Sequence, residues 1–186
     1  MGRVSQAQAE ENRRRVVETA SRLFREQGTH ASVADIMKAA GLTHGGFYKQ
    51  FASKEALIDE ATAHAFGELA RHHETGLEQH GGQRAAAQKA LIDTYLSLGH
   101  RDSPADGCPV AALVTDMARE SEGQEARRIY TEGVGDFAAR LATGDQDGIT
   151  RLCTMLGALV LARATTGSPL SEEILTTVRA ELTASD

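Results

Sequence analysis

The chain has 186 residues, of which 41% are hydrophobic and 25% charged, and this composition is typical of a folded globular protein rather than a disordered one. No stretch approaches the roughly 18 consecutive apolar residues that span a bilayer, and the first ten residues lack the apolar segment of a signal peptide. Two cysteines exclude a disulfide framework, so we expect a cytoplasmic protein that does not enter a membrane.

The net charge of −6 is divided unevenly along the chain. Residues 1 to 54 hold nine Lys and Arg against five Asp and Glu, so this segment carries +4 and the remainder carries −10. A local excess of positive charge is the electrostatic signature of nucleic-acid binding. The N-terminal segment is therefore the candidate for DNA contact.

A first helix is predicted from about Glu11 to Gln27, after a frayed arm from Met1 to Glu10. Its apolar residues recur at helical spacing and share one face, and Gly28 ends it. These residues are Val16, Ala20, Leu23 and Phe24.

The stretch from Ser32 to Lys54 has the pattern of two short helices joined by a tight turn. Ser32 can cap the first helix, and glycine at position 41 can end it in the left-handed conformation. Thr43 then offers a hydroxyl to cap a second helix that runs to about residue 51. Two helices with a glycine-containing turn form the helix-turn-helix unit that many repressors use to read DNA.

Gly45 and Gly46 lie in the first turn of this second helix, where each costs about 0.5–1 kcal/mol relative to alanine. Bare backbone there would let the helix approach DNA closely. Alternatively, the two glycines allow close packing against the preceding helix. The pattern by itself leaves both interpretations open.

The segment GLTHGGFYKQFASKEALI resembles the DNA-binding signature of tetracycline-repressor (TetR)-type transcriptional regulators, and the resemblance covers about residues 11 to 60. The matching positions are Gly41, Phe47, Tyr48, Phe51, Lys54, Glu55 and Leu57. The resemblance implies phosphate contacts for Thr43, Tyr48 and Lys54, and base contacts for His44, Gly45 and Lys49. Ser32 and Gly46 complete the predicted DNA-binding set.

The rest of the chain has helical periodicity and no strand pattern, which predicts an all-α fold. We expect a DNA-binding domain over residues 1–52 and a helical-bundle domain for ligand binding and dimerisation over 53–186. The predicted helices of the second domain are Ser53 to Gln79, Gln83 to Leu98, Pro109 to Arg119, Gly123 to Ala142, Asp145 or Asp147 to Thr165, and one from Ser171, with a loop over 99–107.

The resemblance implies a small-molecule effector and a homodimer. We assign the effector pocket to Leu91, Tyr95, Cys108, Leu113, Met117 and Phe137. The helix ending near Thr165 is so apolar that we expect it to be buried nearly all round. We assign the dimer interface to Leu152, Met155, Leu156, Leu159, Ile174 and Val178, although these residues would equally well close the core of a monomer.

Cys108 precedes Pro109 at a predicted helix start, where the helix dipole favours a thiolate. A thiol sensor of electrophiles or oxidants is therefore an alternative function, whereas a small buried thiol is the commoner role of a lone cysteine. Cys153 is expected to lie in the core.

Four histidines (His64, His72, His73 and His80) lie on or near one predicted helix. A metal site there is conceivable, but no carboxylate or thiol has a suitable spacing to them, so we predict neither a metal nor a cofactor.

No motif of a catalytic nucleophile, nucleotide loop or zinc protease occurs in the chain, and we predict that it is not an enzyme. The predicted function is a ligand-responsive repressor that binds a palindromic double-stranded DNA operator as a homodimer and is released by a small molecule. A constitutive DNA-binding protein without an effector, and an activator, remain alternatives.

Overall fold

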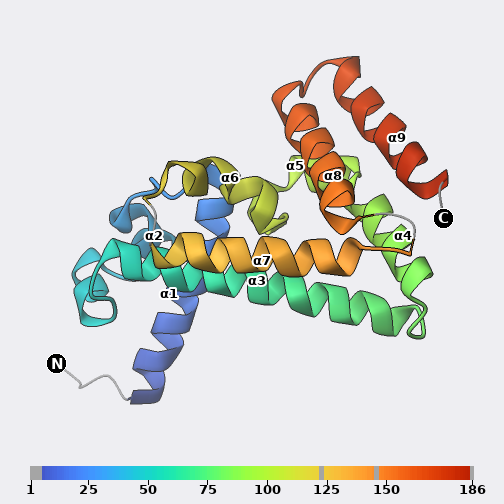
Figure 1. The fold of residues 1–186 in the computed structure, drawn as a ribbon. Coiled ribbons are helices and arrows are strands. Elements are labelled where there is room, and N and C mark those ends of the chain that lie inside the picture. Colours follow the sequence, from blue (N-terminus) through green and yellow to red (C-terminus); the bar gives the residue numbers. More distant parts are fainter. Residues whose placement is uncertain (1–5, 122–123, 145–146, 185–186) are drawn as a thin grey trace.

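The fold, seen in a computed structural model that describes residues 6–121, 124–144 and 147–184, is an assembly of helices (Figure 1). No strand occurs within these ranges, so the predicted all-α class is confirmed. The helices are α1 (Gln6–Gln27), α2 (Val33–Ala39), η1 (His44–Lys49), α3 (Lys54–Gln79), α4 (Arg84–Tyr95), α5 (Leu98–Asp102), η2 (Pro104–Asp106), α6 (Pro109–Arg119), α7 (Glu125–Leu141), α8 (Gly148–Ala164) and α9 (Pro169–Ala184).

The N-terminal helices follow the predicted caps. The Ser32 hydroxyl accepts from the Asp35 N–H at 3.1 Å and starts α2, while Gly41, at φ +69°, lies just beyond its end. α1 begins five residues earlier than predicted, because Gln6 to Glu10 are good helix formers whose side chains bond across one turn. Residues 1–5 of the predicted arm lie outside the described ranges.

The second helix of the helix-turn-helix differs from its prediction. Residues 44 to 49 form the 3₁₀ helix η1 rather than an α-helix to residue 51, and the Thr43 side chain makes no capping hydrogen bond. Two consecutive glycines weaken α-helix formation, and short irregular turns are where 3₁₀ geometry is common.

Two clusters of buried side chains hold the molecule together. The N-terminal core contains Val16, Ala20, Phe24, Ala31, Ile36, Met37, Ala40, Phe47, Phe51, Leu57, Ile58, Ala61, Leu113, Met117 and Ala126. It thus includes the first turns of α3 and one face of α6. The N-terminal helices share their core with these two helices, and the domain boundary at residues 52 and 53 stays a prediction.

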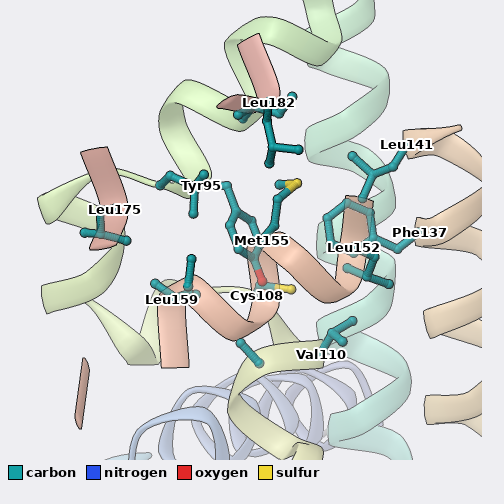
Figure 2. Close-up of a cluster of buried hydrophobic side chains, with 14 of the residues drawn as sticks. Tyr95, Cys108, Val110, Phe137, Leu141, Leu152, Met155, Leu159, Leu175 and Leu182 are labelled. Carbon is teal, nitrogen blue, oxygen red and sulfur yellow. The ribbon is translucent and has the colours of Figure 1, made fainter. Parts of the chain in front are cut away.

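The C-terminal core lies farther along α3, where α7 runs beside it and α8 and α9 pack as a pair (Figure 1). Part of this core is drawn in Figure 2. It contains Ile92, Tyr95, Leu96, Cys108, Val110, Ala111, Phe137, Ala138, Leu141, Leu152, Met155, Ala158, Leu159, Ala162, Leu175 and Leu182.

The prediction for residues 83 to 107 was wrong in two respects. α4 ends at Tyr95, because the Ser97 hydroxyl accepts from the His100 N–H at 3.1 Å and starts α5, so α5 and η2 occupy the predicted loop. The buried face of α4 consists of Gln88, Ile92 and Tyr95, whereas Thr94 and Leu98, which the predicted helix included, are exposed.

α8 was predicted to be buried all round, and this was wrong. Ile149 is 63% exposed and Leu161 56% exposed, and Cys153, expected in the core, is exposed as well. Asp147 caps this helix through its side chain, while Asp145, the other predicted start, and Gly123, the predicted start of α7, lie outside the described ranges. α9 begins at Pro169 rather than Ser171, since proline suits the first turn of a helix.

Within the described ranges, no helix is long and apolar enough to cross a membrane.

Candidate DNA interface and ligand cavity

η1 presents polar and aromatic side chains to solvent over a buried aromatic base. Tyr48 is 69% exposed, and its ring meets Phe47 edge-on at 5.1 Å. Phe47 and Phe51 are buried and stacked at 5.4 Å, and they anchor η1 to the N-terminal core. Thr43, His44 and Lys49 are exposed too, so the segment offers the types of side chain that contact phosphates and bases.

Arg13 of α1 stabilises the position of η1. Its guanidinium donates to the backbone carbonyl of Gln50 and to the carboxylate of Glu60, and it lies 4.3 Å from the centre of the Phe51 ring. These contacts tie α1, the end of η1 and α3 together. The run of arginines at 13–15 marked Arg13 as basic, but its bracing role depends on residues 37 and 47 positions away.

The two glycines of η1 differ in their surroundings. A Cβ added at Gly45 would meet nothing within 4 Å, whereas one at Gly46 would touch Met37 Cε at 3.5 Å. Packing against α2 therefore gives no reason for glycine at position 45. The interpretation that bare backbone there allows close approach to DNA remains a prediction.

The other two predicted DNA contacts start helices. The Ser32 hydroxyl both accepts from the Asp35 N–H and donates to the Asp35 carboxylate at 2.6 Å, so capping already engages it. Lys54 is the first residue of α3 and is partly exposed.

A cavity of about 950 Å³ lies between α3, α4 and the segment from Ser97 to Pro109. Of the six predicted pocket residues, Leu91, Tyr95 and Cys108 line it. Phe137 instead packs in the C-terminal core, and Leu113 and Met117 belong to the N-terminal core. The prediction for these three was wrong because it assigned the wall to α6 and α7, whereas α3 supplies it through residues that include Ala65, Leu69, His72 and His73.

Arg25 connects the N-terminal helices to this cavity. It belongs to α1, is buried and contributes to the cavity wall. Its Nη2 donates to Glu68 Oε2 on α3 at 2.8 Å, and its Nη1 donates to the Gly107 carbonyl at 3.2 Å. Arg25 is a charged residue outside the apolar set that defines the predicted buried face of α1, so its burial was not apparent from the sequence.

Next to Gly107, a series of hydrogen bonds connects further residues that line the cavity. The next residue, Cys108, donates its N–H to His100 Nε2 at 3.0 Å, and His100 Nδ1 bonds the Tyr95 carbonyl at 2.7 Å. Because Nε2 accepts, Nδ1 carries the proton and the ring is neutral. Arg163 of α8 donates to the His100 carbonyl at 3.0 Å, so α1, α4 and α8 all meet the segment of residues 97–109.

The Cys108 thiol is not activated as the helix dipole alone would predict. Burial raises its pKa above the usual value, and this outweighs the lowering by nearby backbone N–H groups of α6 and by Tyr95. A raised pKa disfavours the reactive thiolate. The arrangement of the described residues thus gives the thiol-sensor alternative no support.

The histidines do not form a metal site. Among the described residues no three His, Cys, Asp or Glu side chains are grouped to hold a metal ion. His72, His73 and His80 line the cavity separately, and His64 Nε2 lies 3.5 Å from Glu68.

Comparison with known proteins agrees with this arrangement. Residues 16–61 match the family described as bacterial regulatory proteins, tetR family. The transcriptional regulator AcrR of Shigella flexneri is 39% identical over 61 residues, which are 32% of this chain but only 28% of that protein. The transcriptional repressor DhaR of Mycobacterium sp. (strain GP1) is 26% identical over 142 residues, covering 75% of this chain and 70% of that protein.

Solved structures match nearly the whole chain. A TetR regulator from Chloroflexus aurantiacus has a TM-score of 0.74 at 24% identity and covers 96% of both chains. The reduced form of E. coli NemR has a TM-score of 0.74 at 19% identity and covers 92% of this chain and 95% of its own. At these identities the likeness shows a shared fold.

The helix-turn-helix segment, the fold and these relatives define a DNA-binding transcriptional regulator. The chain resembles TetR-type regulators: residues 16–61 match the family's model, and its fold is that of solved TetR-family regulators.

Proposed function

We propose that the protein is a ligand-responsive transcriptional repressor that binds a palindromic operator as a homodimer and releases it when a small molecule enters the cavity. Two η1 segments would then enter successive major grooves, with half-sites about 34–36 Å or a multiple of this distance apart. The name of the relative DhaR, a repressor, supports the direction of regulation.

The observation that carries the proposal is the position of Arg25. One buried side chain of the DNA-binding region forms part of the cavity wall and bonds both α3 and the segment before α6. A ligand that displaces Glu68 or Gly107 must also displace α1. Since binding free energies are linked reciprocally, DNA and ligand would then oppose each other. A constitutive DNA-binding protein would need no such cavity.

For the dimer we propose the exposed face of α8. The predicted interface residues Leu152, Met155 and Leu159 are buried within one protomer, so they are unavailable to a partner. The outward face carries other apolar residues at helical spacing, namely Ile149, Cys153, Val160 and Leu161. Apolar side chains grouped on an exposed helix face are typical of protein interfaces.

Of the other predicted interface residues, Leu156, Ile174 and Val178 are partly buried against the C-terminal core. They retain some exposed surface, so they can flank the proposed interface without forming its centre.

A titration of the purified protein against its own upstream intergenic DNA, at several salt concentrations, tests the proposal. We expect saturable binding of one dimer per site, far tighter than to scrambled DNA and weaker as salt rises. Weak binding that does not depend on sequence, for every intergenic fragment of the genome, would refute the regulator function.

A further inference from the structure

Tyr95 and His73 line the cavity, and each has a hydrogen-bonding atom that lacks a strong partner among the described residues. Tyr95 is only 4% exposed, and its hydroxyl lies beside the Cys108 thiol (Figure 2). His73 Nε2 is buried and has no hydrogen-bond partner among the described residues, and the buried Tyr95 Oη has none other than the neighbouring Cys108 thiol, which is a weak one. Burying a polar atom without a hydrogen-bond partner costs free energy. A ligand that forms a hydrogen bond with either atom therefore binds more tightly than one that only fills the cavity.

Both rings are held by one neighbour, which fixes where these atoms lie. The centres of the His73 and Phe137 rings are 4.8 Å apart, and those of the Tyr95 and Phe137 rings are 6.2 Å apart. Burial and the positive charge of Arg140 lower the pKa of His73 to about 4, so its imidazole is neutral at physiological pH. A neutral imidazole and a phenol can each donate or accept one hydrogen bond.

The charged groups beside α1 and the segment of residues 97–109 are already engaged. Arg25 pairs with Glu68, the exposed Asp106 pairs with Arg22, and both ring nitrogens of His100 are bonded. An ion entering there would lose its hydration without finding a free counter-charge.

Two other cavity residues carry charge, and both are exposed. Arg84 donates to the Ala139 carbonyl at 3.1 Å, and Arg140 lies 4.0 Å from Glu74. Solvent screens such groups, so they contribute little to ion binding.

We propose that the cavity takes an uncharged, largely apolar small molecule with a ring system and a hydrogen-bonding oxygen, of the aromatic alcohol or ketone class, bonded by Tyr95 Oη or His73 Nε2. This inference rests on the proposed function, in which the cavity is the effector site. The volume of about 950 Å³ lies within the range of ligand pockets and admits a molecule of several rings.

Three naphthalene derivatives of one size test the class: neutral 2-naphthol, anionic 2-naphthoate and cationic 2-naphthylmethylammonium. Binding to the full-length protein is measured by fluorescence titration at pH 7. We expect 2-naphthol to bind at least tenfold more tightly than either ion. Equal or tighter binding of an ion would overturn the proposal, and so would the absence of any 2-naphthol binding.

Variants identify the groups that bond the oxygen. We expect Tyr95→Phe or His73→Phe to weaken 2-naphthol binding about fivefold or more, while Lys89→Ala, at an exposed position of α4 outside the cavity wall, leaves it unchanged. Thermal unfolding verifies that each variant folds. If Tyr95→Phe does not fold, His73→Phe alone tests the assignment. Unchanged affinity in both folded variants would overturn the assignment.

Operator binding of the same preparation separates this inference from the proposed function. Loss of the preference for 2-naphthol, with operator binding intact, overturns the ligand class alone. Preferential 2-naphthol binding without operator binding supports the ligand class and refutes the regulator.

Discussion

Arg25 and Glu68 form an ion pair, 2.8 Å from Nη2 to Oε2, that joins the first helix to the wall of the cavity. The arginine is buried and the carboxylate partly so, and the same guanidinium reaches the Gly107 carbonyl. Exposed ion pairs contribute little to stability, whereas breaking a buried one leaves a desolvated charge. This pair is therefore a structural link between α1 and the cavity wall, and in the proposed function it is the route by which a ligand influences the DNA-binding helices.

Replacing Arg25 with Met is expected to lower the free energy of unfolding by about 1–3 kcal/mol, because Glu68 and the Gly107 carbonyl lose a charged donor. Urea unfolding measures the change. Arg22→Met is the matched control, since its pair with Asp106 is exposed and its loss should cost less than about 0.5 kcal/mol. Equal effects of the two variants would show that the buried link is unimportant.

Tyr48→Ala and Lys49→Ala are each expected to lower operator affinity about tenfold, or roughly 1.4 kcal/mol, without unfolding the protein. Both side chains are exposed, so their removal leaves the N-terminal core intact. Anisotropy titration and thermal unfolding measure the two properties separately, with Lys89→Ala on α4 as an exposed control. Unchanged affinity in both variants would remove the assignment of η1 as the DNA-reading segment.

Gly45→Ala separates the two interpretations of the paired glycines. The added methyl group meets nothing within 4 Å, and the backbone there has a negative φ, so stability should be unchanged or rise by up to about 1 kcal/mol. If DNA approaches this backbone closely, operator affinity nevertheless falls severalfold. Normal affinity in this variant would argue that position 45 does not face DNA.

Leu161→Glu is expected to convert the proposed dimer to monomer, because the interface would have to bury an unpaired carboxylate. Sedimentation equilibrium measures the assembly, and Leu77→Glu, at an exposed leucine of α3, is the control. A dimer that persists in Leu161→Glu would place the interface elsewhere.

The reactivity of the Cys153 thiol is an independent test of the dimer interface proposed on the exposed face of α8. In the monomeric variant its exposed thiol should react readily with a thiol reagent, and in the dimer it should be protected. Cys108 should react slowly in both, because burial raises its pKa. Cys153→Ser and Cys108→Ser assign the two reactions.

Acid is expected to destabilise the fold through His73. Its pKa is lowered to about 4 in the folded protein, against an ordinary value of 6.5, so between these pH values the unfolded chain binds more protons. Stability therefore falls as pH drops from about 6.5 to 4. Urea unfolding across this range should show a weaker pH dependence in His73→Phe than in wild type, and Lys89→Ala, at an exposed position of α4, should behave like wild type.

Local sequence was sufficient where a structural element depends on its own residues. Ser32 caps α2 as predicted, Ser53 and Asp147 cap α3 and α8 at predicted helix starts, of which Asp147 was one of two alternatives, and Gly41 adopts the left-handed conformation after α2. These features depend on contacts within a few residues, which sequence spacing specifies directly. The DNA-binding segment was recognisable for the same reason, because its signature is contiguous.

Packing between distant helices decided the rest. Arg25 is buried because residues 68 and 107 meet it, and α8 keeps an exposed apolar face because α7 and α9 cover only its other sides. Likewise, α3 supplies much of the cavity wall, whereas α6 and α7 contribute only Pro109 and Arg140 to it. Periodicity shows that a helix has an apolar face, but which neighbour covers that face, and how completely, is decided only when helices far apart in the sequence come together.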